Sequence, residues 1–163
     1  CALPIYAGCG TGLLAPLVRG FAKSIEGVDL SPEMIEKAKD LDIYLALHVR
    51  ELTGFMNDHP GQYDIVAMAD TLIYFGSLEE VFQAALETLK PNGSFIFTVE
   101  KIIEPASDET FRLNPHGRYS HHEDYVQECL QKLGFKPNST DEHMLRLEAN
   151  EPVIGLLVTA SKN

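Results

Sequence analysis

Short apolar runs alternate with polar, glycine- or proline-containing segments along the chain. The runs at residues 3–7, 25–29, 44–49, 63–69 and 94–99 have the length of β-strands, and several are apolar almost throughout. Strands that are covered on both faces of a parallel sheet have this composition. The first run contains Pro4, which cannot donate a hydrogen bond to a neighbouring strand. The pattern therefore predicts five parallel strands.

Between these strands, apolar residues recur at helical spacing. The first such set predicts a helix that starts late or bends, because Pro16 is tolerated only near a first helical turn; it comprises Leu13, Leu14, Leu17, Val18 and Phe21. Ser31 as N-cap and Pro32 as first helical residue predict a second helix over residues 33–39.

Two further amphipathic helices are predicted by a serine with a glutamate three positions later, the pattern of a capping box. The pairs are Ser77 with Glu80 and Ser120 with Glu123. We expect the first of these helices to stop at residues 91–93, a Pro-Asn-Gly segment, and the second to end just before Gly134.

The C-terminal part departs from this alternation. Residues 136–147 and 153–160 read as two strands joined by the hairpin segment 148–152. Residues 100–119 read as a loop too long for a simple connection, and therefore as a candidate for substrate contact. The chain is thus predicted to be a single α/β domain over residues 1–163, with a parallel sheet closed by an antiparallel hairpin.

Composition narrows the possible partners. The chain has 163 residues, the length of one domain. Its formal charge of -11 disfavours nucleic acid, and its 13 Lys and Arg residues are scattered. Three cysteines without a C-x-x-C pair favour a reducing compartment and suggest no metal site.

The sequence contains no long apolar stretch and no leader, so we expect a cytoplasmic protein without membrane partners. Because the chain begins at Cys1, we also expect that its N-terminal part is missing.

The most informative motif is a glycine-rich turn after the first predicted strand. Gly8, Gly10 and Gly12 are spaced as G-x-G-x-G, and Asp29 ends the next predicted strand. Glycines allow the backbone to approach a ligand, a helix N-terminus favours anionic groups, and a carboxylate at this place accepts ribose hydroxyls. A dinucleotide fingerprint would need a third glycine where Leu13 stands. The motif therefore predicts a nucleoside cofactor other than a dinucleotide.

This spacing, together with the segment 27–34, resembles the class I S-adenosylmethionine (SAM) dependent methyltransferases. The resemblance implies a Rossmann-like sheet of seven strands in the order 3-2-1-4-5-7-6, with the last strand antiparallel, and SAM as cofactor. The segments 27–34, 70–76 and 112–121 are similar to predicted small-molecule methyltransferases of the TPR-associated type, although no TPR repeat is present. The resemblance to the class I family implies these cofactor-binding residues: Gly8, Cys9, Gly10, Gly12, Asp29, Leu30, Met34, Glu51, Leu52 and Asp70.

Candidate acceptor-binding residues come from the later segments. Methyl transfer needs an in-line nucleophile more than acid-base groups, and Asp70, His116 and His121 are the candidate bases. Arg112 and Arg118 could hold an anionic acceptor as a guanidinium pair. Tyr74 and Tyr119 complete the predicted substrate site for an unidentified small-molecule acceptor.

Two alternatives remain open at this point. Tyr6 stands where the family usually has an acidic residue before the first glycine, which leaves room for a catalytically silent SAM-binding or scaffold module. A nicotinamide-dependent oxidoreductase is a weaker alternative, opposed by Leu13. The sequence does not indicate the oligomeric state.

Overall fold

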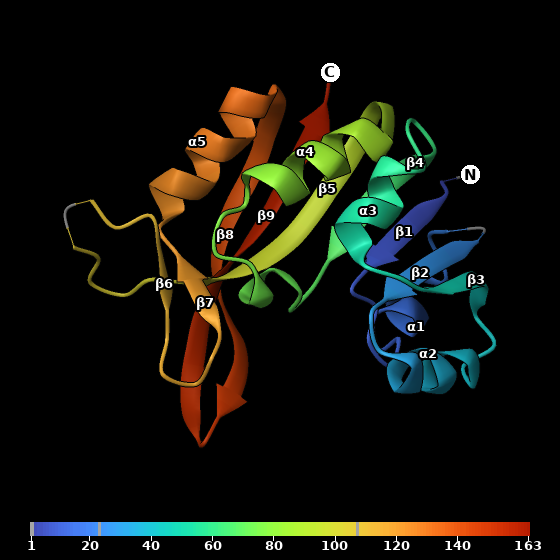
Figure 1. Cartoon of the computed structure of the whole chain (residues 1–163), viewed down its shortest axis with the longest axis horizontal. Coiled ribbons are helices and arrows are strands. Elements are labelled where there is room, and N and C mark those ends of the chain that lie inside the picture. The colour runs from blue at the N-terminus through green and yellow to red at the C-terminus, as the bar shows by residue number, and fades with distance from the viewer. Residues whose placement is uncertain (1, 23, 107) are drawn as a thin grey trace.

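Five parallel strands form the centre of the sheet in the computed structural model, which describes residues 2–22, 24–106 and 108–163 (Figure 1). They are β1 (Pro4–Ala7), β2 (Ile25–Asp29), β3 (Tyr44–Val49), β4 (Tyr63–Met68) and β5 (Leu89–Lys101). Their spatial order is β3-β2-β1-β4-β5. Pro4 is the first residue of β1, a position where a missing N–H is tolerated within a sheet.

An antiparallel hairpin extends the sheet beyond β5. Its strands are β8 (Phe135–Glu148) and β9 (Glu151–Lys162). β9 runs antiparallel to β5, with Val158 opposite Phe97, and β8 pairs with β9. The predicted order 3-2-1-4-5-7-6 is therefore confirmed, with β8 and β9 as the sixth and seventh predicted strands.

The predicted loop over residues 100–119 is wrong in part. It contains the short strand β6 (Phe111–Leu113), which pairs antiparallel with β7 (Tyr119–His121), and β7 pairs with the end of β5. A tight turn joins the two strands, since the Gly117 amide donates to the Asn114 carbonyl at 2.9 Å. The sheet therefore has nine strands among the described residues.

The helices follow the predicted alternation, with local corrections. They are α1 (Ala15–Val18), α2 (Pro32–Lys39), α3 (Leu52–Asn57), α4 (Glu79–Thr88), α5 (Glu123–Leu133) and the 3-10 turn η1 (Leu72–Tyr74). The late start of α1 is confirmed, but α1 is a single turn and the Phe21 side chain is exposed. Ser31 caps α2 as predicted, because its hydroxyl accepts from the Met34 amide at 3.3 Å. Gly134 ends α5 in the left-handed conformation, also as predicted.

Both predicted capping boxes are wrong. The N-cap of α4 is Leu78, which provides no side-chain cap, and its amide donates to the Tyr125 hydroxyl at 3.0 Å. The N-cap of α5 is His122, because Ser120 is taken up by β7. α4 also ends at Thr88, before residues 91–93, which lie within β5. Helix α3 was not predicted at all.

Two cores lie on opposite faces of the sheet. Ile5 and Ala7 of β1 belong to the larger core, which α3, α4 and α5 cover side by side (Figure 1). Tyr6, between them, points to the other face and packs with Ile35 of α2. Alternation along a strand produces this division. Burial of large apolar side chains stabilises by about 1.5–3 kcal/mol each, and the larger core holds an aromatic cluster of Phe82, Phe95, Phe97 and Phe135.

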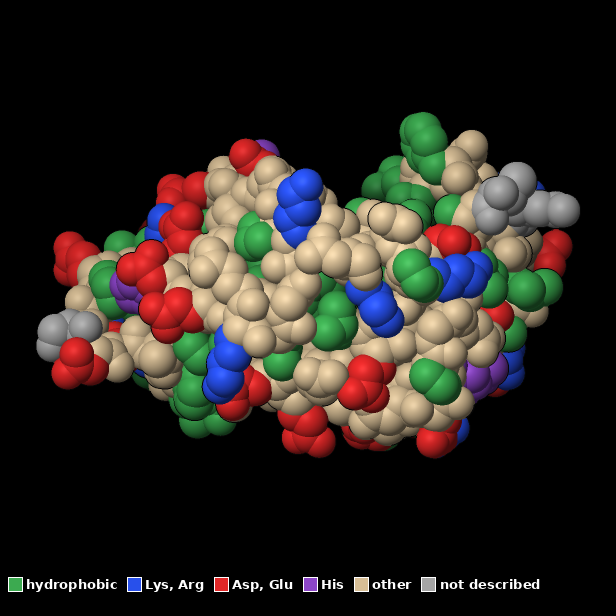
Figure 2. Space-filling view, turned by 90° about the horizontal axis from the view of Figure 1, so that it is seen from above, with side chains coloured by type: hydrophobic (Ala, Val, Ile, Leu, Met, Phe, Trp, Pro, Cys, Tyr) green, Lys and Arg blue, Asp and Glu red, His purple; other side chains and the backbone are tan. Residues whose placement is uncertain are grey.

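The Lys and Arg residues, which are scattered along the sequence, are also scattered over the surface. Seen from above, most Lys and Arg side chains lie apart from one another, and Asp and Glu side chains are frequent at the left and along the lower edge (Figure 2). In the described part of the chain, none of the helices has the length and apolar composition needed to cross a bilayer.

Candidate functional site

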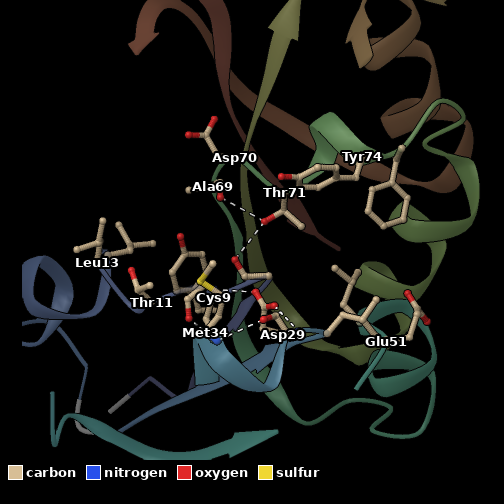
Figure 3. Close-up of a pocket in the computed structure, with 18 of the residues that line it drawn as sticks. Cys9, Thr11, Leu13, Asp29, Met34, Glu51, Ala69, Asp70, Thr71 and Tyr74 are labelled. Atoms are coloured by element: carbon tan, nitrogen blue, oxygen red, sulfur yellow. Dashed lines mark hydrogen bonds between the residues drawn. The ribbon is translucent and has the colours of Figure 1, made fainter. Parts of the chain in front are cut away.

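A cavity of about 890 Å³ opens at the carboxyl ends of the parallel strands (Figure 3). Its walls come from the segments that follow β1, β2, β3 and β4. β1 lies between β2 and β4, so the strand order reverses here. Open α/β sheets bind ligands at such a switch point. The cavity is therefore the candidate functional site, and it includes nine of the ten predicted cofactor-binding residues; Gly12 packs beside it.

The glycine loop shapes one wall of the cavity. Gly8, Gly10 and Gly12 all have positive φ angles, of 75°, 54° and 84°. A Cβ at Gly8 would lie 2.3 Å from Thr71 Oγ1, and one at Gly12 would lie 2.8 Å from Leu41 Cδ1. At Gly10 nothing lies within 4 Å of the corresponding position. The outer glycines thus permit close packing, and the middle one leaves open space at the cavity.

Asp29 connects the glycine loop to the start of α2. Its Oδ2 accepts from the Gly10 amide at 2.8 Å and its Oδ1 from the Ser31 amide at 2.9 Å. Each carboxylate oxygen retains a further lone pair for a ligand. Leu30 and Met34 lie beside Asp29 in the cavity wall, with 71% and 38% of their surface exposed, so apolar area is available to a flat ring.

Glu51 and Leu52 line the cavity from the segment after β3. Glu51 is the N-cap of α3, and its carboxylate accepts from the Thr53 and Gly54 amides at 2.8 and 2.7 Å. Partial burial raises the pKa of this carboxyl group, but these hydrogen bonds and the nearby Arg50 outweigh it and leave the pKa lowered. Glu51 is therefore ionised at neutral pH.

Asp70 and Tyr74 stand on the other side of the cavity (Figure 3). Asp70 has a φ of 54°, its amide donates to Thr98 Oγ1 at 3.0 Å, and its side chain is 51% exposed. Tyr74, on η1, is also largely exposed. Thr71 was not predicted as a site residue, yet its hydroxyl donates to the Ala7 carbonyl at 3.1 Å and so ties this segment to the end of β1.

Tyr6 and Cys9 line the cavity between these groups. Burial, followed by the charges of Cys9, Asp70 and Asp29, raises the pKa of Tyr6 to about 12. Burial and Asp29 likewise raise the pKa of Cys9 to about 12, against a lowering by its own backbone hydrogen bond. The Cys9 thiol therefore stays protonated and is a poor nucleophile at neutral pH.

The two predicted substrate arginines do not form a pair. Arg112 donates two hydrogen bonds to Glu109, at 2.7 and 2.5 Å, and Arg118 pairs with Glu148 at 2.5 Å. Neither lines the large cavity; Arg112 borders a separate hollow of about 260 Å³. Each arginine has its own carboxylate partner in the structure, and the guanidinium pair stays a prediction.

The remaining predicted residues also lie away from the large cavity. His116 borders the smaller hollow, and Tyr119 packs its ring 6.0 Å from that of Phe111. His121 is fully buried, with Nε2 3.0 Å from the Gly76 carbonyl oxygen. Burial lowers the pKa of His121, more than its hydrogen bonds to Gly76 and Phe75 raise it. Of the predicted bases, only Asp70 reaches the cavity.

Arg146, which was not predicted as a site residue, forms an ion pair with Asp70. Arg146, on β8, contacts Asp70 Oδ1 at 3.1 Å, Glu148 Oε2 at 3.2 Å and the buried carboxylate of Glu100. Because Glu148 also pairs with Arg118, these charges form one network between the C-terminal hairpin and the cavity. No local pattern in the sequence marks Arg146, since its partners are distant along the chain.

Comparisons with known proteins agree with this geometry. The family model described as "Methyltransferase domain" matches residues 7–140. The chain therefore belongs to the methyltransferase domain family.

Two curated relatives are O-methyltransferases by name. The chain is 34% identical over 140 residues to malonyl-[acyl-carrier protein] O-methyltransferase of Priestia megaterium, covering 82% of this chain and 44% of that protein. It is 23% identical over 131 residues to a ubiquinone biosynthesis O-methyltransferase of Xanthomonas campestris, covering 74% of this chain and 54% of that protein. The chain spans about half the length of the curated relatives it matches.

Solved structures share the fold. An S-adenosylmethionine dependent methyltransferase from Mesorhizobium loti has a TM-score of 0.77 at 20% identity, covering 99% of this chain and 91% of that one. The [4+2]-cyclase SpnF has a TM-score of 0.80 at 16% identity, covering 99% and 74%. Because a cyclase shares it, this fold alone does not define the reaction.

Proposed function

We propose that this domain binds SAM and transfers its methyl group to a small-molecule acceptor, as the predicted TPR-associated type of methyltransferase would. The observation that carries the proposal is the contact between the Gly10 amide and the Asp29 carboxylate inside the cavity. It brings a left-handed glycine turn and a ribose-binding carboxylate together at the switch point of the sheet. Family membership supports the same reading.

The residues of the cavity fit such a cofactor. A volume of about 890 Å³ lies in the range of small-molecule sites. Three carboxylates line the cavity, from Asp29, Glu51 and Asp70, and no Lys, Arg or His does so among the described residues. A negative cavity favours a ligand with a sulfonium and an ammonium group. Open space at Gly10 and uncovered side chains at Leu30 and Met34 provide room and apolar contact.

Each group has a defined task in this proposal. The free lone pairs of Asp29 accept the ribose hydroxyls, and Leu30, Met34 and Leu52 cover the adenine, with Glu51 at its edge. The glycine loop accommodates the methionine end. Bound SAM supplies an activated methyl group, so the main task of the protein is to orient an acceptor in line with it. Asp70 lies across the cavity and is the candidate group to accept a proton from the acceptor.

Calorimetric titration with SAM and with its demethylated product S-adenosylhomocysteine (SAH) tests the proposal. We expect micromolar binding of both, and loss of most of the binding in Asp29→Ala. Asp141→Asn, an exposed change on β8, is the matched control. Incubation with SAM and a fractionated small-molecule extract, followed by mass spectrometry, should reveal a product heavier by one methyl group. Absence of binding to both ligands would refute the proposal.

A catalytically silent SAM-binding module is the second candidate. Tyr6 supports it, because the pKa of this phenol is raised to about 12 and it therefore supplies no negative charge where the family usually has a carboxylate. Tight SAM binding without methyl release to any acceptor would favour this candidate, whereas a single methylated product would exclude it.

A further inference from the structure

The three carboxylates that line the cavity differ in how many of their oxygens have hydrogen-bond or ion-pair partners. Asp29 and Glu51 each accept hydrogen bonds from two backbone amides. Both oxygens of each carboxylate are therefore bound to the neighbouring loop or to the first turn of a helix. Asp70 is different. Only its Oδ1 has a side-chain partner, Arg146, and among the described residues its Oδ2 has none. With half of its side chain exposed at the cavity, Asp70 is the carboxylate that an acceptor would meet.

Within the described ranges of the chain, no guanidinium group near Asp70 lacks a carboxylate partner and so could hold an anion. Arg146 is enclosed by the carboxylates of Asp70, Glu100 and Glu148. Arg118 pairs with Glu148, so this network holds three carboxylates and two guanidinium groups. A carboxylate or phosphate that approached Asp70 would meet net negative charge, and like charges repel.

The uncharged side chains that line the cavity near Asp70 favour an apolar ligand that carries a positive charge. Tyr74 and Phe75 border the cavity on the same side as Asp70, and Leu13 and Leu17 border it from α1 and the segment before it. The Tyr74 ring is 67% exposed and is open to a ligand. Aromatic faces attract ammonium groups, and a nearby carboxylate adds to that attraction.

We infer that the acceptor is a small apolar molecule that carries an ammonium group and no carboxylate or phosphate, and that Asp70 selects it by charge. This inference rests on the proposed methyltransferase function, because it concerns the acceptor of that same site. Asp70 is then a specificity-determining residue that contacts the acceptor, and Arg146 is a positioning residue that holds one oxygen of Asp70 and leaves the other to the acceptor.

Three probes that share a phenol ring and differ in charge test the inference. They are tyramine, 4-hydroxyphenethyl alcohol and 4-hydroxyphenylacetate, titrated calorimetrically into the whole chain with and without saturating SAH. We expect tyramine to bind at least about tenfold more tightly than 4-hydroxyphenylacetate, with the alcohol between them, and we expect added salt to reduce this preference.

The Asp70→Asn variant identifies the source of the preference. Asparagine tolerates the positive φ of this position, so the fold should persist, and the melting temperature checks this. We expect the preference for tyramine to fall to within about threefold in Asp70→Asn and to stay unchanged in Asp141→Asn. Binding of the carboxylate as tightly as the amine, equal behaviour of all three probes, or an unchanged preference in Asp70→Asn would overturn the inference. Failure of both SAM and SAH to bind would instead refute the proposed function, and the charge preference would still be measured in the cofactor-free titrations.

Discussion

The backbone amide of Gly10, in the turn after β1, donates a 2.8 Å hydrogen bond to Oδ2 of Asp29, the last residue of β2. The contact fixes the turn after β1 against the end of β2. Asp29 also lines the cavity. A ligand that bridges the two segments would therefore meet a carboxylate whose position is set before binding.

Asp29→Asn should weaken SAH binding by about 10- to 100-fold, because hydrogen bonds to a charged group contribute about 1.5–3 kcal/mol. The substitution preserves the shape of the side chain and removes its charge. Calorimetric titration measures the effect, with Asp141→Asn as the control. Equal affinities in the two variants would show that Asp29 serves only the local loop structure.

Gly8→Ala should destabilise the fold more than Gly117→Ala. Both glycines have positive φ angles, of 75° and 83°, for which a side chain costs about 1–2 kcal/mol. Only at Gly8 would the added Cβ also overlap Thr71, and such overpacking costs about 1–3 kcal/mol more. Urea unfolding of both variants measures the difference in the free energy of unfolding. Equal losses would show that the Thr71 contact relaxes without cost.

Tyr63→Phe should lower the free energy of unfolding by about 1–3 kcal/mol, because it leaves a buried carboxylate without its hydroxyl donor. The Tyr63 hydroxyl donates to Glu26 Oε2 at 2.8 Å, and Glu26 is only 9% exposed. Tyr74→Phe, at an exposed ring, is the matched control and should change stability little. A neutral effect of Tyr63→Phe would mean that His48, 3.6 Å from Glu26, compensates.

Stability should fall as the pH is lowered from about 7 to 5, and His121 should contribute to this loss. Its Nε2–H donates to the Gly76 carbonyl, so protonation would occur at Nδ1, which is buried and has no hydrogen-bond partner. Burial lowers the pKa of His121 in the folded state. The unfolded chain then binds more protons over this interval, so the stabilising contribution is complete above the unfolded pKa and is lost below it.

Urea unfolding at several pH values measures this slope. We expect a shallower dependence in His121→Gln, whereas His143→Gln, at an exposed position on β8, should leave the slope as it is. The same slope in all three proteins would mean that other groups control the acid sensitivity in this interval.

The elements that sequence reasoning predicted correctly are those specified by neighbouring residues. Ser31 and Pro32 start α2, Gly134 ends α5, and the apolar runs form the strands in the expected order. The serines of the two predicted capping boxes were misleading because Leu78 is the N-cap of α4 and Ser120 lies within β7. The Tyr125 hydroxyl, which is remote in sequence, accepts the Leu78 amide.

The cofactor side of the candidate site was accessible from the sequence, and the acceptor side was not. Glycine spacing and the distance to Asp29 are local properties of the glycine turn and the next strand, so by themselves they predict which residues line the cavity. Pairing of charges is decided by tertiary structure. Folding places Arg146 against Asp70 and Arg118 against Glu148, and it buries His121, because segments far apart in the chain come together at one edge of the sheet. Arg112 differs, since its partner Glu109 is only three residues away.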